Sequence, residues 1–136
     1  MFRRYGLLFA VIIAVALVAV SCSGGTSSTS IDGAAIQVGS EVNDDLYIVS
    51  PKTNLAVGED FYVSFDNNAS FGTDYITMKV ENSESGEVLE EVEYNVDPEW
   101  TIIVTEQLYF PDPGKFKISF IVSEKARATQ EVIVAE

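Results

Sequence analysis

The chain has 136 residues, which is enough for one domain and little more. Its formal net charge of −13 at pH 7 makes nucleic acid and anionic lipid headgroups poor partners. It has no histidine and one cysteine, which argues against a Ser-His-Asp triad, a cysteine protease, an ordinary zinc site and an intramolecular disulfide.

The first 21 residues have the layout of a secretory signal peptide. Arg3 and Arg4 precede an uncharged apolar run over residues 7–20, which ends in small residues. A membrane-spanning helix needs roughly 20 apolar residues, and this run is shorter. We therefore expect residues 1–21 to form a signal helix that is removed after export. A short N-terminal membrane anchor that is never cleaved is the alternative.

Cys22 follows this segment in the motif Ala19-Val20-Ser21-Cys22. Without a histidine to lower its pKa and move protons, Cys22 is not expected to act as a catalytic thiolate. The motif resembles the lipobox of bacterial lipoproteins. This resemblance implies cleavage between Ser21 and Cys22, acylation of Cys22, and a stable membrane anchor once two or more acyl chains are attached. Ser23 stands where an inner-membrane retention signal usually has aspartate, which favours the outer membrane in a Gram-negative cell.

Glycine, serine and threonine dominate the stretch that follows the cysteine. Such a composition has little to bury and is typical of a flexible linker. We therefore expect three parts: the signal peptide at residues 1–21, the acylated cysteine with its tether at residues 22–33, and one folded domain at residues 34–136.

The folded part alternates apolar and polar residues with a period of two. The apolar positions Phe61, Val63 and Phe65 are an example. The predicted strands lie within residues 36–39, 46–50, 60–67, 74–82, 88–96, 100–110, 114–122 and 129–135. Turn sequences rich in Pro, Gly, Asn and Asp separate them, and no segment has the pattern of an amphipathic helix. Seven or eight short strands of this kind predict a single all-β domain, an antiparallel β-sandwich.

Two stretches are similar to a known family. "LYFPDPGKFKISFIV" (residues 108–122) resembles the strand–corner–strand passage late in bacterial immunoglobulin-like modules of the PKD and fibronectin type III kinds. "LAVGEDFYVSF" (residues 55–65) looks like the second strand of these modules. The resemblance covers roughly residues 45–136 and implies an immunoglobulin-like sandwich, a fold that by itself says little about function.

Calcium is the one metal for which the sequence offers candidate ligands. Ca²⁺ takes about six to eight oxygen ligands, which loops at the ends of a sandwich can supply. The candidate residues are Asp44, Asp45, Glu59, Asp60, Asp66, Asn68 and Asp74. None of them follows the EF-hand order, and Asn and Asp are also ordinary turn residues. We expect no cofactor, with calcium as the candidate to test.

Trp100 is the only tryptophan, and it has two interpretations. Together with Tyr94 or Tyr109 it could stack on a carbohydrate, or it could anchor the core of the sandwich, which the pattern favours. Residues 85–100 also carry six acidic side chains, which are Glu87, Glu90, Glu91, Glu93, Asp97 and Glu99. This cluster could dock a basic partner, but a solvated edge that discourages aggregation is the more common role of such a charge run.

These features predict a protein that is not an enzyme. Carboxylates are scattered along the chain, and a sandwich of about 100 residues rarely offers a deep cleft. We expect an exported lipoprotein, held at the membrane by its lipid anchor, whose β-sandwich is a non-catalytic binding or assembly module for a protein or another component of the cell envelope. The alternatives are a calcium- or carbohydrate-binding domain, and an inhibitor or accessory subunit of an envelope enzyme.

Overall fold

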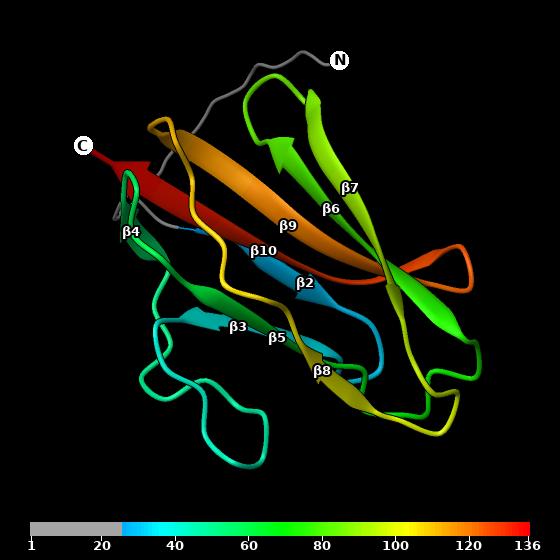
Figure 1. Cartoon of the computed structure of the whole chain (residues 1–136). Coiled ribbons are helices and arrows are strands. Elements are labelled where there is room, and N and C mark those ends of the chain that lie inside the picture. The colour runs from blue at the N-terminus through cyan, green and yellow to red at the C-terminus, as the bar shows by residue number, and fades with distance from the viewer. Residues whose placement is uncertain (1–25) are drawn as a thin grey trace.

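The computed structural model describes residues 26–136, which form two β-sheets packed face to face (Figure 1). The larger sheet has the strand order β2-β10-β9-β6-β7, and β4 also pairs with β10. Its six strands are β2 (Ser28–Ser30), β4 (Asn54–Ala56), β6 (Tyr75–Asn82), β7 (Val88–Asn95), β9 (Gly114–Val122) and β10 (Lys125–Ala135). The smaller sheet has the order β3 (Ala35–Gly39), β5 (Tyr62–Asp66) and β8 (Ile102–Val104).

The prediction of an all-β, two-sheet sandwich is confirmed. The nine described strands exceed the predicted seven or eight, because β2 and β4 are too short to show an alternating pattern. All described pairs are antiparallel except β4 with β10, which is parallel. The predicted signal helix, Ser21 and Cys22 lie outside the described residues. Residues 26–136 contain no helix long and apolar enough to cross a membrane.

The core lies between the two sheets and is built from the alternating apolar positions. Phe61, just before β5, and Val63 and Phe65 within β5 are at most 2% exposed. They face the buried side chains of β6, β9 and β10, and the ring of Phe65 stacks on that of Phe120 with centroids 4.5 Å apart. The period-two pattern therefore located most of the core correctly.

The predicted corner after residue 110 closes one end of this core. Phe110 and Phe116 flank the Pro-Asp-Pro-Gly turn, and their rings stack with centroids 4.4 Å apart. Phe110 also stacks on Phe61, with centroids 5.4 Å apart. The turn thus folds the chain back so that three aromatic rings pack together.

The segment predicted as a tether, residues 22–33, overlaps the folded part. Ser28, Thr29 and Ser30 pair in antiparallel register with Gln130, Thr129 and Ala128 of β10. Just before them, both the amide and the hydroxyl of Ser27 donate to Glu131 Oε1, each at 2.9 Å. Small hydroxylated residues gain little from burial, but their backbone groups can still pair with a strand at the edge of a sheet. Because Ser28–Ser30 pair in this way, the folded part begins before Ala34.

The predicted strand at residues 46–50 is wrong. This segment is a loop with a single bridge between Val42 and Ile48. Leu46 and Ser50 have positive φ angles of 69° and 56°, which an extended strand does not permit. The Asn43 side chain accepts hydrogen bonds from the amides of Asp45 and Tyr47 and thereby holds the loop.

The predicted strand at residues 100–110 is also too long, because only Ile102–Val104 is a strand. Immediately after it, the Thr105 hydroxyl accepts a hydrogen bond from the Val63 amide at 3.1 Å. The Thr105 side chain thus accepts the hydrogen bond that a backbone carbonyl would accept in a regular sheet. Backbone pairing returns only as a single bridge between Leu108 and Phe61. The smaller sheet therefore ends in a very short edge strand.

Candidate functional site

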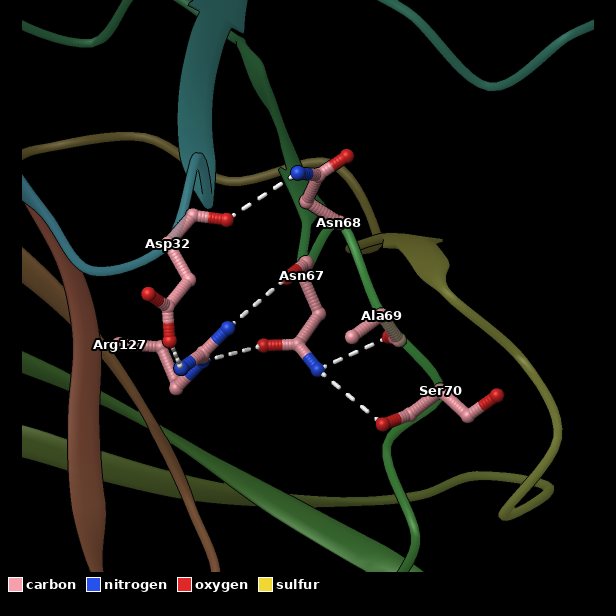
Figure 2. A network of polar contacts seen from close by, with 6 residues as sticks. All are labelled: Asp32, Asn67, Asn68, Ala69, Ser70 and Arg127. Carbon is pink, nitrogen blue, oxygen red and sulfur yellow. Dashed lines mark hydrogen bonds and ion pairs between the residues drawn. The ribbon is translucent and has the colours of Figure 1, made fainter.

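One side of the sandwich is closed, which we define as the side where β2, β4 and β10 of the larger sheet meet β3 of the smaller one. There Arg127 of β10 reaches the residue that follows β5 (Figure 2). Its Nε donates to Asn67 Oδ1 at 2.8 Å and its Nη2 donates to the Asn67 carbonyl at 3.1 Å. Asn67 is 3% exposed, and its amide group also donates to the carbonyls of Ala69 and Ser70. The guanidinium thus links the two sheets.

The turn between β2 and β3 belongs to the same network. Arg127 Nη1 lies 3.4 Å from Asp32 Oδ2, and the Asn68 side chain donates to the Asp32 carbonyl at 3.1 Å (Figure 2). The Ile31 amide donates to the Arg127 carbonyl at 2.9 Å. The polar groups in this loop bind one another and a cationic side chain, which is a structural role.

This network includes one group of predicted calcium ligands. Asp66 Oδ1 accepts from the Asn68 amide at 2.8 Å, and Asp66 Oδ2 accepts from the Tyr47 hydroxyl at 3.0 Å. The hydrogen bond to Asp66 also raises the pKa of Tyr47. Asp74 lies just before β6, where its carbonyl accepts from the Val96 amide. Both oxygens of Asp66 are therefore engaged without a metal.

The other calcium candidates lie in two separate loops. Asp44 and Asp45 belong to the loop before β4, and Glu59 and Asp60 to the turn between β4 and β5. Glu59 forms an ion pair with Lys52. The hydrogen bond from Lys52, together with one from the Ala56 amide, lowers the pKa of Glu59. Across residues 26–136 no three His, Cys, Asp or Glu side chains gather in a way that could hold a metal. Calcium binding stays a prediction.

The opposite side of the sandwich is open, and we define it as the side bordered by the edge strands β7 and β8. A groove of about 590 Å³ lies there, lined by the end of β7, the following turn and β8, with Leu46 from the loop before β4. We call it the Trp100 groove. Its lining is mostly apolar, and Glu99 is the one carboxylate in it.

Trp100 is 52% exposed, so the interpretation of Trp100 as a core anchor is wrong. Its amide donates to the Asp97 carbonyl at 2.9 Å, which closes a turn before β8 begins. Within β8 it is Ile103 that is buried, while Ile102 and Val104 are only half-buried. Ile102 and Val104, which alternate with Ile103 and were predicted to share the face of Trp100, therefore point away from the core. Of the two interpretations, the structure retains an exposed aromatic surface beside Tyr94.

Tyr94 lines the same groove from β7. Its hydroxyl is buried and forms no hydrogen bond of ordinary length among the described residues, but the carboxylate of Glu106 is close enough to act on it. Burial, and then the negative charges of Glu106 and Glu90, raise the pKa of Tyr94 well above its ordinary value. The groove thus combines an exposed indole, a half-buried phenol ring and aliphatic side chains, which suits apolar or aromatic contacts rather than acid–base chemistry.

A second groove of about 410 Å³ lies farther along β7. We call it the Tyr109 groove; Leu89, Glu90 and the chain around Tyr109 line it. Leu89 is 48% exposed and Tyr109 is 61% exposed. Large apolar side chains exposed together in this way mark surfaces that contact other molecules.

The surface around both grooves is strongly acidic. No basic residue occurs between Lys79 and Lys115, and the same stretch carries ten acidic ones: Glu81, Glu84, Glu87, Glu90, Glu91, Glu93, Asp97, Glu99, Glu106 and Asp112. Within the described part of the chain only Glu81 of these forms an ion pair, with Lys117 at 3.6 Å. Lys79 of β6 stands opposite Glu91 in the register of β6 and β7, and the acidic residues of this stretch far outnumber the basic residues beside them.

The sequence indicated Trp100 and Tyr94 but missed their partners in the groove, Leu46 and the residues of β8. One signal for the exposure of Trp100 was present. In Asp97-Pro98-Glu99-Trp100, Asp at the first position and Pro at the second are typical of a tight turn, which places the tryptophan at its end. The role of Arg127 had no such signal, because Asn67 lies 60 positions away.

No protein-family model matches the chain, and no curated protein matches its sequence. Among solved structures, the soluble domain of PmoD from Methylocystis sp. ATCC 49242 (Rockwell) is similar with a TM-score of 0.47 and 8% sequence identity, over 75% of this chain and 90% of that one. So distant a similarity assigns neither a family nor a function.

Proposed function

We propose that this chain is an exported lipoprotein, anchored through acylated Cys22, whose β-sandwich binds another component of the cell envelope through the Trp100 groove and catalyses no reaction. The observation that carries the binding role is the exposed indole: Trp100 is 52% exposed beside the half-buried ring of Tyr94. Tryptophan and tyrosine in such grooves are typical centres of binding energy. The anchor rests on the sequence motif at residues 19–22.

Fractionation of cells tests the anchor. The Cys22→Ser variant should leave the membrane fraction, because the thiol that carries the acyl chains is gone. Ser23→Ala is the matched control and should stay in the membrane. Incorporation of a labelled fatty acid into the wild-type chain, and its absence from Cys22→Ser, completes the test. A Cys22→Ser chain that remains membrane-bound would instead support the uncleaved N-terminal helix.

Site-specific photo-crosslinking in cells tests the binding role. A photoreactive amino acid at position 100 should give a discrete adduct with an envelope component. The same amino acid at position 75 is the control, because Tyr75 is 41% exposed but lies outside both grooves. Trp100→Ala should remove the interaction and change the free energy of unfolding by less than about 0.5 kcal/mol, as for other exposed side chains. Equal adducts at positions 100 and 75 would argue against the groove.

A carbohydrate is the second candidate ligand of this groove, because Trp100 and Tyr94 are placed together there. Trp100 is the only tryptophan of the chain, so its fluorescence reports on the groove directly. Saturable changes in emission on titration with envelope glycans would favour a glycan over a protein. Emission that does not respond to any glycan would remove this candidate.

A further inference from the structure

We propose that the partner at the open side is a protein that contributes an extended, positively charged segment, which adds as a strand to the free edge of β7. This inference rests on the proposed function, because it specifies what the binding module binds. It combines three observations: an unpaired strand edge, a one-sided charge and two apolar grooves along that edge.

The backbone of β7 is available for pairing. β7 has eight residues and within residues 26–136 it pairs with β6 alone, so its other edge presents N–H and C=O groups that no described strand pairs with. β8, the neighbouring edge, has only three residues. At the far end of the larger sheet, β2 and β4 already cover the edge of β10. Addition of a strand to an exposed edge is a common way to bind an extended peptide, and β7 is the edge with room for it.

The charge of this edge selects the occupant. Glu91 and Glu93 are exposed on β7, and no basic residue lies between Lys79 and Lys115. Pairing of β7 with the same strand of a second copy would bring these carboxylates together, which is unfavourable. A segment with lysine or arginine opposite Glu91 and Glu93 is attracted where a second copy would be repelled. Electrostatic attraction at long range also increases its rate of association.

The two grooves add positional specificity. Leu89, near the start of β7, lines the Tyr109 groove, whereas Tyr94 and Asn95, at its end, line the Trp100 groove. The intervening residues include the exposed glutamates. The partner segment should therefore carry an apolar side chain near each end, about six residues apart, with basic residues between them. Apolar side chains in grooves supply most of the affinity, and the charges supply orientation.

Synthetic peptides test this chemistry on the full chain in a neutral detergent, with Trp100 fluorescence as the readout. The first peptide has nine β-forming residues without tryptophan, with valine near each end and three lysines at alternate positions between. The second replaces the lysines by glutamate. The third keeps the lysines but has two prolines, which lack the N–H needed for pairing. We expect saturable binding of the first peptide, weakened by salt, and at least about tenfold weaker binding of the others, equivalent to roughly 1.4 kcal/mol.

Two charge variants separate β7 from the rest of the acidic surface. Glu91→Lys with Glu93→Lys should weaken binding of the first peptide at least about tenfold, since each removes an attraction and adds a repulsion. Glu124→Lys with Glu136→Lys makes the same change in net charge at exposed sites off β7 and should weaken it no more than about threefold. Amide resonances of Val88–Asn95 should shift and become protected from exchange on binding.

The outcomes distinguish this inference from the proposed function. Equal binding of the lysine and proline peptides, or equal effects of the two charge variants, would overturn strand addition. If no peptide binds but position 100 still forms its adduct in cells, the binding module stands and the partner chemistry is wrong. If neither occurs, both proposals fail. A dimer of the chain that Trp100→Ala dissociates would show that a second copy fills the groove, which would also overturn the inference.

Discussion

The closed and open sides of this sandwich are built in opposite ways. On the closed side, short strands cover the edge of β10, and Arg127 and Asn67 join the two sheets by hydrogen bonds. The pocket between β3 and β10 measures only about 190 Å³. On the open side the edges of β7 and β8 have no further strand in residues 26–136, and the Trp100 groove measures about 590 Å³.

The polar groups on the two sides differ in the same sense. The side-chain atoms of Asn67 are all used in hydrogen bonds, whereas the buried hydroxyl of Tyr94 has no partner in the described chain. Buried polar groups are normally satisfied, so an unsatisfied one costs stability. The contrast indicates that the closed side is held by a satisfied network of hydrogen bonds and that the open side is not. The following substitutions can break or sharpen this contrast.

Arg127→Ala should give the largest effect. It leaves two buried acceptors on Asn67, the side-chain oxygen and the carbonyl, without a donor. The free energy of unfolding should fall by about 3 kcal/mol, since each unsatisfied buried group costs roughly 1–3 kcal/mol. Chemical denaturation measures this, with Lys125→Ala, an exposed residue of the same strand, as the control. A loss no larger than that of the control would mean that the closed side does not depend on this network.

Gly33→Ala and Gly86→Ala compare one glycine from each side. Both have positive φ angles, 81° and 76°, so alanine is strained by about 1 kcal/mol at either position. At Gly33 the new methyl group would also lie 2.6 Å from Asn68 Nδ2, whereas at Gly86 it meets nothing within 4 Å. We expect losses of about 2 and about 1 kcal/mol respectively. Equal melting temperatures for the two variants would contradict the tighter packing of the closed side.

Tyr94→Phe should stabilise the protein by about 1 kcal/mol, because it removes a buried hydroxyl that has no partner. Burial raises the pKa of Tyr94 above its ordinary value of 10.0. The folded state keeps the phenol neutral to a higher pH than the unfolded state does, so stability is unaffected by this ionisation below pH 10 and falls as pH rises from there toward the folded pKa. The variant has no phenol to ionise and should therefore lose less stability in alkali. Tyr109→Phe is the control, because Tyr109 is 61% exposed. It should change neither the stability at neutral pH nor the loss of stability in alkali.

Glu131→Gln should give the smallest effect, a loss of stability at neutral pH that disappears in acid. Burial raises the pKa of Glu131, but hydrogen bonds from Ser27 and the charge of Lys115 outweigh it, so the folded pKa lies below 4.5. The contribution of Glu131 is complete above that ordinary value and is lost as pH falls through the folded pKa. Between neutral and acid pH the wild type should therefore lose more stability than Glu131→Gln. Identical pH profiles would show that the contact of Ser27 with Glu131 adds nothing.

The sequence predicted the core and the longer strands well. β6 and β9 were found nearly residue by residue, because Ile76, Met78 and Val80 alternate with polar neighbours and their burial follows that alternation. The sequence failed where hydrogen bonds rather than burial decide the structure. The pairing of β2 joins residues about 100 positions apart, and its serines and threonines are all exposed. No local pattern contains that information.

The site was predicted by residue type but not by arrangement. The tryptophan, the nearby tyrosine and the glutamates were visible in the sequence, and only the fold shows that they share one side with Leu46 and β8. The face of Trp100 was misread because Ile102, Ile103 and Val104 are all apolar, so their pattern does not show which face of the strand is buried, and the structure buries Ile103. Choosing the wrong face of a strand moves every one of its side chains between the core and the surface.

The pairing of β2 has a consequence for how far the domain can stand from a membrane. If Cys22 carries the lipid, only four residues separate it from Ser27, whose amide already binds Glu131. Five residue steps span at most about 18 Å when fully extended. The strand order places β7 at the opposite end of the sheet from β2. β7 lies four strands away from β2, and neighbouring strands are roughly 4.8 Å apart, so the acidic edge would lie about 19 Å from the anchored edge. This distance is comparable to the full extended length of the segment between Cys22 and Ser27. The anchored strand would lie near the bilayer, and the binding edge would be carried outward as far as the sheet is wide.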